Sequence, residues 1–308
     1  MLGRLLNWRY IVPVTLFLLL RLWFSLWASG SAILLPIQID SSSSYYGMTP
    51  LSGSDAIIWG PWQRSDTIWY TKIAERGYSA DDLSTAFFPL YPLLIRATIT
   101  LFPINSVAAG LIVSSLAALG AFIWFYQLTR EQHGDKTARR ALLWLAIFPT
   151  AYFLFAAYTE SLFLFFAVGS WWFAQKTKWE LAGLMGGLAA LTRPQGLLLA
   201  LPLAFIFFSQ FRRRQVPLWR AANLAIVIGG GLLFVVYMFQ LNGSLTAWFR
   251  IEGLWRQPSM PWESIWQSLL EILTSGDIAV GFVNALDLGL TLLFLGLIVW
   301  SVLRKEYA

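Results

Sequence analysis

The sequence has no cysteine among its 308 residues and only one histidine. Without cysteine the chain has no disulfide bonds, no thiolate nucleophile and no metal site with cysteine ligands, and its redox compartment is left open. Charged residues make up only 12% of the chain, whereas a soluble protein has roughly 25%. The chain is instead 57% hydrophobic, with a mean hydropathy of +0.61. These values predict a membrane protein.

Several apolar stretches are long enough to cross a bilayer, which requires about 20 residues. We therefore predict an all-α, polytopic protein that forms one domain over residues 1–308. The predicted helical spans are eight: 10–28, 106–129, 141–157, 160–175, two short helices within 181–211 that are joined by a Thr-Arg-Pro-Gln-Gly turn, 221–241 and 278–303.

The basic residues predict which loops stay in the cytoplasm, because short cytoplasmic loops are enriched in lysine and arginine. The apolar stretch 86–102 is the doubtful span. If it crossed the membrane, the basic loop 130–140 and every later basic loop would lie on the wrong side. We therefore place residues 89–102 as a juxtamembrane helix on the outer surface. This predicts cytoplasmic termini, a first outer loop at 29–105 and a second at 242–277.

The polar candidates for chemistry all fall on the outer side of this topology. The first outer loop supplies acidic, basic and aromatic side chains, and short turns and the second outer loop supply the others. The candidate site residues are Asp55, Asp66, Trp69, Tyr70, Lys72, Glu160, Arg193, Arg250 and Arg256. Because they share one face of the membrane, we predict a single outward-facing site at the bilayer surface.

Such a site suits a reaction between a lipid-linked phosphate and a hydroxyl acceptor. A carboxylate can take the acceptor proton as a general base. Arginine or lysine can hold the phosphate and stabilise the charge on it as it leaves. Transport of lipid-linked glycans through a charged pathway is the alternative from another functional class. A non-catalytic homologue is the third reading.

Four blocks of sequence resemble the GPI mannosyltransferase II (PIG-V) family of the GT-C class of membrane glycosyltransferases. They occur in the family's order and cover roughly residues 59–263. The blocks are SDTIWYTKIAERGY with AFFPLYPLLIR, FAAYTESLFLFFAVGSWWFAQ, LAGLMGGLAALTRPQGLLLALPLA, and GSLTAWFRIEGLWRQPSMPW.

The resemblance implies a GT-C-like bundle and a donor that is a polyprenyl- or dolichyl-phosphate sugar, with mannose the expected sugar. It implies that Asp66 is the general base, Glu160 a second carboxylate of the site and Arg193 a phosphate ligand in an inverting displacement. The acceptor would be a glycolipid or a glycan, and no nucleic acid partner is expected. The chain departs from the family at Ser65, where tryptophan is usual, and relatives often continue through further spans.

Structural readings compete with the functional ones at several residues. Asp66 is well placed to cap the helix that follows it, and Glu160 to face the positive end of its own helix. Asp81 and the adjacent Asp82 are more typical of a solvated turn than of a divalent cation site, so no cofactor is expected. Asp287 lies in the middle of an apolar span, which predicts a buried partner such as Asn284 or an arginine.

Overall fold

The computed structural model describes residues 8–35, 51–244, 260–274 and 276–303. All regular structure in these residues is helical. Contacts divide the chain into two compact units, Met1–Trp248 and Phe249–Ala308, and each is described by itself. The predicted single domain is not tested by this division and stays a prediction.

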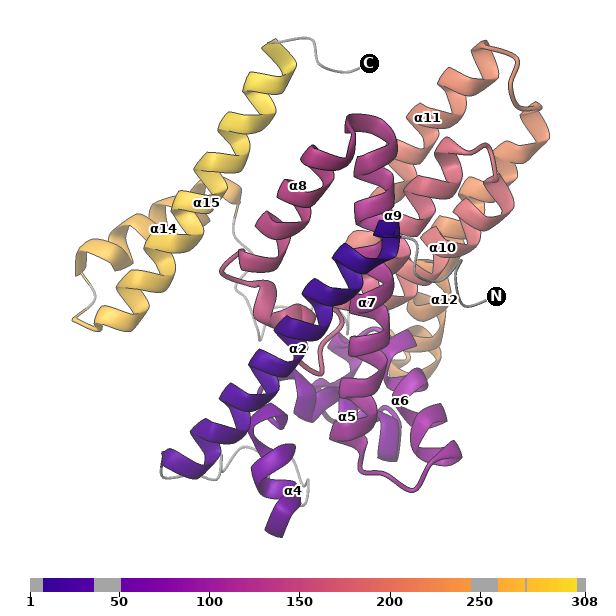
Figure 1. Cartoon of the computed structure of the whole chain (residues 1–308). Helices are drawn as coiled ribbons and strands as arrows, with labels where there is room; N and C mark the ends of the chain where they lie inside the picture. The colour runs from indigo at the N-terminus through magenta and orange to yellow at the C-terminus, as the bar shows by residue number, and fades with distance from the viewer. Residues whose placement is uncertain (1–7, 36–50, 245–259, 275, 304–308) are drawn as a thin grey trace. The chain divides into compact units, whose positions relative to one another are not determined.

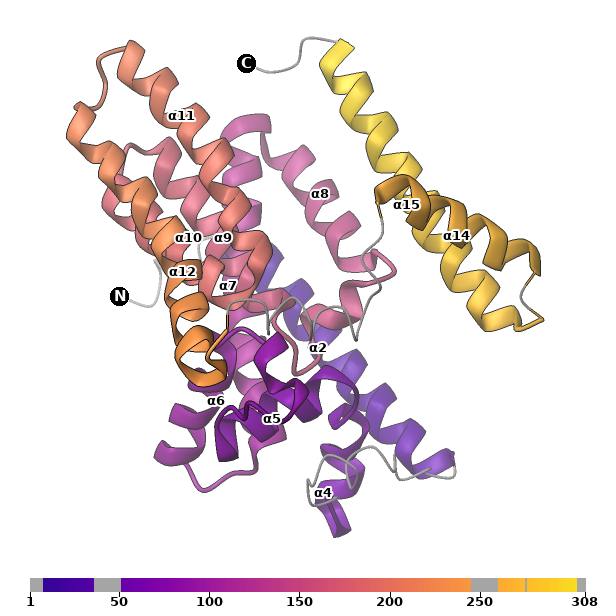
Figure 2. The ribbon, with the colours of Figure 1, turned by 180° about the vertical axis from the view of Figure 1, so that it is seen from behind.

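The first unit is built around four helices that pack side by side, as Figures 1 and 2 show from opposite directions. Helix α7 packs against α9, α9 against α10, and α10 against α12. Their bounds are α7 (Ser106–His133), α9 (Glu160–Gln175), α10 (Trp179–Thr192) and α12 (Ala222–Asn242).

Helices α10 and α12 approach closely because glycines face each other across the contact. A Cβ on Gly230 would overlap the backbone of Gly187, and a Cβ on Gly183 would overlap the carbonyl oxygen of Asn223. Small residues of this kind let membrane helices come close enough for extensive van der Waals contact. The close contact fixes the α10 end that carries Arg193.

Other helices surround this group. Helix α2 packs on α7 and α8, and the segment formed by η4 and α11 packs on α10 and α12. The bounds are α2 (Trp8–Leu34), α8 (Asp135–Ile147), η4 (Pro194–Leu199) and α11 (Ala200–Arg212). The predicted turn between two short helices is confirmed, since α10 ends at Thr192 and η4 begins at Pro194.

Short helices from the first predicted outer loop lie at one end of the first unit, where α5 and α6 pack on the four-helix group and α4 and η1 pack on α2 (Figure 2). They are α4 (Gly53–Ile58), η1 (Gly60–Trp62), α5 (Asp66–Arg76), η2 (Leu83–Ala86) and α6 (Leu90–Leu101). The predicted juxtamembrane helix over 89–102 forms as the helix α6, and its place at the membrane surface stays a prediction. Its residues Tyr91 and Ile95 are fully buried against the core.

Five helices among the described residues are long and apolar enough to cross a membrane: 10–34, 106–133, 194–212, 218–242 and 280–301. This confirms a polytopic, integral membrane protein. The predicted number of eight spans is not confirmed, because α8, α9 and α10 have 13, 16 and 14 residues. At about 1.5 Å per residue, each of these three is shorter than the hydrocarbon core.

The span predicted at 141–157 is wrong as a single helix. Helix α8 begins earlier, at Asp135, and ends at Ile147, and a 3₁₀ turn, η3 (Ala151–Leu154), follows. The reason is Pro149, which disfavours the helical conformation of the residue before it and removes a hydrogen-bond donor.

The basic loops lie at the end of the first unit opposite to α5 and α6. At that end Lys176 pairs with Glu131 at 3.0 Å, and Arg220 donates a hydrogen bond to the Thr177 carbonyl at 2.9 Å. The structure thus separates these basic residues from the predicted site. Which end faces the cytoplasm stays a prediction.

The second unit contains α14 (Pro261–Thr274) packed on α15 (Ile278–Leu303). Asp287 is exposed in this structure, and the Asn284 side chain donates a hydrogen bond of 2.6 Å to Glu271 on α14. The predicted partner of Asp287, Asn284 or an arginine on another helix, stays a prediction.

Candidate active site

Asp66 is the first residue of α5, and Ser65 occupies the N-cap position before it. The predicted capping role of Asp66 is therefore wrong, since the cap position belongs to its neighbour. Ser65 has φ = 48°, in the left-handed region that a residue with a Cβ rarely adopts. Backbone strain of this kind is concentrated at functional sites, and here it sets the direction in which α5 leaves the loop.

The start of α5 is bound to the connection between α8 and α9. The Thr67 hydroxyl donates to the Ala157 carbonyl at 3.3 Å. Burial raises the pKa of the nearby Tyr158 hydroxyl, and the charge of Asp66 raises it further. The Thr67 hydrogen bond holds Asp66 beside the first turn of α9, where Glu160 is the first residue.

Glu160 forms an ion pair with Arg193, with 2.5 Å between Oε1 and Nη1. Arg193 also donates to the Thr159 hydroxyl at 3.3 Å. Both charged side chains are about one third exposed, 32% for Glu160 and 33% for Arg193. The pair is therefore open on one side, where a ligand can approach it.

Arg193 reaches this position because α10 stops directly before it. Its backbone is extended, as expected for a residue that precedes proline. Gly196 then lets η4 fold back onto α10, because a Cβ at Gly196 would overlap the backbone of Ala189 and Ala190. The Arg-Pro-Gln-Gly sequence thus directs the guanidinium group toward the start of α9.

The Asp66 carboxylate is half-buried, and it makes no hydrogen bond or ion pair with any described side chain. Burial raises the pKa of Asp66, the nearby charge of Glu160 raises it further, and the charge of Arg193 opposes both. Glu160 Oε2 is buried and also lacks a hydrogen-bond partner in the part of the chain that the structure describes. Buried carboxylate oxygens without a hydrogen bond are uncommon in folded proteins, and a carboxyl group with a raised pKa, such as Asp66, is typical of functional sites.

Arg193 keeps its positive charge in this environment. Burial disfavours the charged form, but the charge of Glu160 and its hydrogen bond outweigh burial, so the pKa of Arg193 is raised. The site therefore combines a carboxylate that can accept a proton with a fixed cation that can bind an anion.

Tyr70 lies behind this cluster and is buried. Its hydroxyl shares a hydrogen bond of 3.3 Å with the Thr159 hydroxyl, and its ring packs edge-on against Phe87 and Tyr91. Burial, and then the charge of Asp66, raise the pKa of Tyr70. Tyr70 is thus a neutral residue that positions Thr159, which in turn contacts Arg193.

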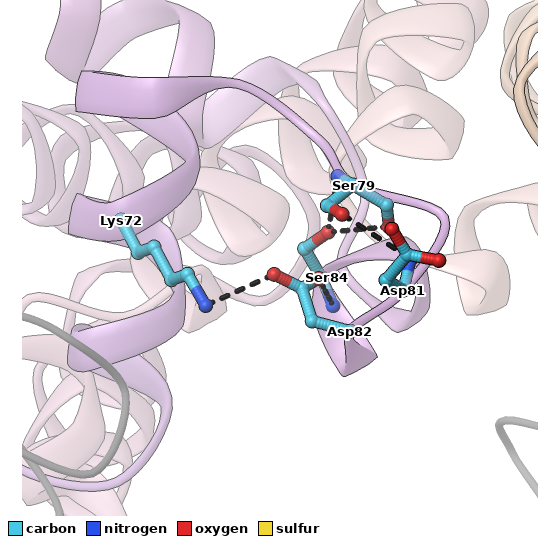
Figure 3. A network of polar contacts seen from close by, with 5 residues as sticks. All are labelled: Lys72, Ser79, Asp81, Asp82 and Ser84. Atoms are coloured by element: carbon cyan, nitrogen blue, oxygen red, sulfur yellow. Dashed lines mark hydrogen bonds and ion pairs between the residues drawn. The ribbon is translucent and has the colours of Figure 1, made fainter.

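Lys72 and Trp69, two other predicted site residues, have protein partners in this structure. Lys72 pairs with Asp82 at 2.9 Å (Figure 3) and lies 5.0 Å from the centre of the Trp69 ring. Trp69 is 2% exposed and stacks on Phe87. Neither face of the Trp69 ring is open to a sugar here, and the substrate-binding roles of both residues stay predictions.

The acidic turn at Asp81 and Asp82 is held by its own hydrogen bonds. The Ser84 backbone N–H donates to Asp82, and the Asp81 backbone N–H donates to the Ser79 hydroxyl (Figure 3). Three or more potential metal-ligating histidine or acidic side chains do not gather anywhere in the described ranges. Metal dependence is untested.

The remaining predicted site residues lie apart from this cluster or outside the described residues. Asp55 is on α4, where the side-chain amide of Asn105 donates to it at 3.3 Å. This bond ties α4 to the start of α7. Arg250 and Arg256 lie outside the described residues. The structure therefore brings together Asp66, Glu160, Arg193 and Tyr70 from the predicted set.

The profile of a family described as mannosyltransferase (PIG-V) matches residues 5–242. The chain belongs to this family. It is also similar to GPI mannosyltransferase 2 of Yarrowia lipolytica (strain CLIB 122 / E 150), with 28% identity over 209 residues. That alignment covers 68% of this chain and 55% of the relative, so the chain spans about half the length of that protein. No solved structure matches the chain.

The matched region contains the whole cluster, from Asp66 on α5 to Arg193 after α10. It also contains two residues that the sequence reasoning missed, Tyr158 and Thr159, which precede Glu160. Both residues could have been found from their position directly before Glu160 in the Ala-Ala-Tyr-Thr-Glu sequence. Side chains at the start of a helix can contact the elements that pack against that end.

Proposed function

We propose that the chain is a membrane glycosyltransferase that transfers mannose from a polyprenyl- or dolichyl-phosphate donor to a hydroxyl group of a glycolipid or glycan acceptor. The observation that carries the proposal is the unpaired, half-buried Asp66 carboxylate beside the ion pair of Glu160 and Arg193. Membership of the mannosyltransferase family supports the choice of reaction and of sugar.

In this mechanism Asp66 accepts the proton of the acceptor hydroxyl while the acceptor oxygen attacks C1 of the mannose. The bond between C1 and the phosphate oxygen breaks on the opposite face of the ring, and the lipid phosphate leaves with the bonding electrons. The configuration at C1 is inverted, so a β-linked donor gives an α-mannoside. The proton ends on Asp66 and is later lost to water.

The electrostatics of the cluster suit these two tasks. A general base works best when its pKa is close to the working pH, and burial moves the pKa of Asp66 in that direction. Arg193 is placed to stabilise the negative charge that grows on the departing phosphate. Glu160 holds Arg193 in place, and Tyr70 does so indirectly through Thr159.

The test is mannose transfer by the purified full chain in liposomes, supplied with radiolabelled polyprenyl-phosphate mannose and a membrane lipid extract as the source of acceptors. Asp66→Asn is expected to lower the rate by about 100-fold or more, the usual contribution of a general base. Asp82→Asn is the matched control, since Asp82 lies in the same loop but is paired with Lys72, and its rate is expected to stay within about threefold of wild type.

Two outcomes contradict the proposal. Full transfer by Asp66→Asn would make Asp66 a structural residue. No transfer by the wild-type chain, together with movement of lipid-linked sugar between the leaflets, would favour the transporter reading.

A further inference from the structure

The connection between α11 and α12 is short. The apolar helical segments 194–212 and 218–242 are each long enough to cross a membrane, and only residues 213–217 join them. Because both segments cross the hydrocarbon, so short a connection is held at the level of the lipid headgroups. It lies at the end of the first unit opposite to α5 and α6 (Figure 1). The charges that this connection carries therefore face the phosphate groups of membrane lipids.

Three successive arginines, Arg212, Arg213 and Arg214, stand at the end of α11. All three are exposed, and none of them forms an ion pair with an acidic side chain in the ranges that the structure describes. Arg220, at the other side of the connection, is instead paired with Glu180 at 3.3 Å. The charges of the three successive arginines are therefore available to an anion.

A cavity of about 610 Å³ lies beside this connection, and two of the three arginines line it. Guanidinium and carboxamide groups both donate hydrogen bonds, and arginine binds phosphate with two parallel ones. Apolar side chains complete the lining, so the cavity suits a ligand that has an anionic group next to hydrocarbon. The lining residues are Phe211, Arg212, Arg214, Gln215, Val216 and Pro217.

The backbone of Arg214 is strained. It has φ = 56°, in the left-handed region that glycine adopts most readily. The Arg214 N–H donates to the Phe211 carbonyl at 2.9 Å, and the Gln215 N–H donates to the Gln210 carbonyl at 3.0 Å. These two bonds form the helix end at which glycine is usual. An arginine that occupies this position in spite of the strain indicates that its side chain has a task of its own.

An exposed apolar face of α11 leads to the first of these arginines. Leu201, Phe205 and Phe208 are each more than half exposed. With Arg212 they follow one another at intervals of four, three and four residues, so all four share one face of the helix. From Leu201 to Arg212 the helix rises about 16 Å, close to half of the hydrocarbon core of about 30 Å. An acyl chain of one leaflet that lies along this face would bring its phosphate to Arg212.

We propose that residues 211–217 bind the phosphate headgroup of an anionic membrane phospholipid, with Arg212 and Arg214 as its ligands and an acyl chain along the exposed face of α11. The site lies at the other end of the first unit from the candidate active site and does not depend on the proposed function. A lipid bound there ties the connection between α11 and α12 to one leaflet.

The experiment measures binding of short-chain phosphatidylglycerol to the purified full chain in detergent, from the rise in Tm with lipid concentration. Phosphatidylcholine, which has no net charge, should give no such rise. Arg212→Gln and Arg214→Gln should each raise the Kd for phosphatidylglycerol about fivefold or more. Arg213→Gln is the matched control. It removes the same charge from the same connection but does not line the cavity, so its Kd should stay within about twofold of wild type.

Arg214→Gly separates lipid binding from stability. Glycine adopts a positive φ without strain, so the Tm without lipid should rise above that of the wild-type chain. The Kd for phosphatidylglycerol should nevertheless rise about fivefold, as it does in Arg214→Gln. A residue that only ends the helix would not change lipid affinity and stability in these opposite directions.

Four outcomes would overturn the proposal. An equal rise in Kd in Arg212→Gln and Arg213→Gln would show a general attraction of basic residues for anionic lipid. Wild-type affinity in both Arg212→Gln and Arg214→Gln would remove the two ligands. Equal stabilisation by inorganic phosphate would identify a free anion as the ligand, and equal stabilisation by phosphatidylcholine would show that only the hydrocarbon is bound.

Discussion

Two aspartates in the first predicted outer loop, Asp66 and Asp82, have the same side chain in two different environments. Asp82 accepts a hydrogen bond of 2.8 Å from the Ser84 backbone and pairs with Lys72 (Figure 3). Burial alone would raise the pKa of Asp82, but these bonds outweigh it and lower the pKa. Asp66 is without such bonds, and its pKa is raised by burial and by Glu160. Asp82 therefore stabilises the fold, and Asp66 is available for chemistry.

The cations beside the two aspartates differ in the same way. Lys72 bonds directly to Asp82 and covers the Trp69 ring. Arg193 bonds to Glu160 and not to Asp66, so it influences Asp66 only through its charge. The arrangement keeps the Asp66 carboxylate and the Arg193 cation close together without a direct ion pair between them.

Exchanging the two cations for glutamine should give the largest contrast. We expect Arg193→Gln to lower kcat for mannose transfer by about 100-fold or more, the typical cost of removing a group that stabilises charge in the transition state. Lys72→Gln should keep kcat within about threefold. The measurement is the initial rate at saturating donor, with thermal unfolding followed in parallel to show that each variant is folded.

Arg193→Lys provides the check on that result. Lysine keeps the charge but not the planar geometry of the guanidinium group, so partial recovery of kcat is expected. Equal loss of activity in the Arg193→Gln and Lys72→Gln variants would show that the two cations do not differ in function.

That Asp66, Glu160 and Arg193 lie close together could be predicted from the sequence, because it follows from the predicted topology. Asp66, Glu160 and Arg193 lie in turns that the arrangement of apolar spans and basic loops assigns to one side, and the structure brings them together. Pro194 and the glycine that follows likewise predicted the turn after α10, which the structure confirms.

The partners of individual side chains could not be predicted in the same way. Nothing near Lys72 in the sequence shows that it bonds to Asp82, ten residues later, and Asp55 bonds to Asn105 from a different helix. Ser65 has a positive φ, and two residues later Thr67 donates a hydrogen bond to Ala157, 90 residues further along the chain. Such features arise from tertiary contacts, which periodicity and charge patterns do not encode.

The pH dependence of mannose transfer should distinguish the roles of Asp66 and Asp82, with a smaller effect than the exchange of the cations. Asp66 must be deprotonated to act as a base, so activity is lost as the pH falls through its pKa. Because burial and Glu160 raise that pKa, the acid limb should lie above the pH expected for an ordinary aspartate. Glu160→Gln removes a negative neighbour and should move the limb to lower pH, measured as kcat/KM against pH.

Asp82→Asn should leave the acid limb where it is, since Asp82 is bound to Lys72 and Ser84. If the acid limb moves in Asp82→Asn and not in Glu160→Gln, the titrating group is Asp82 and not Asp66. Arg193→Gln, if enough activity remains to measure, should move the limb to higher pH, because it removes the positive charge that lowers the pKa of Asp66.

The smallest expected effect is on stability, and it concerns Asp82. The pKa of Asp82 is lower in the folded protein. Its contribution to stability is therefore present above the pKa of the unfolded chain and is lost as the pH falls through the pKa of the folded protein.

Asp82→Asn should lower the free energy of unfolding by about 0.5 to 1 kcal/mol near pH 7, a fall in Tm of about 1 to 4 °C. Asp81→Asn is the matched control, because Asp81 donates its hydrogen bond to Ser79 from the backbone N–H and not from the side chain. Thermal unfolding followed by tryptophan fluorescence should show a Tm difference between the two variants at pH 7 that disappears in acid. If the difference is absent at pH 7, the ion pair between Lys72 and Asp82 does not stabilise the loop, and the contrast with Asp66 would then rest on the catalytic cluster alone.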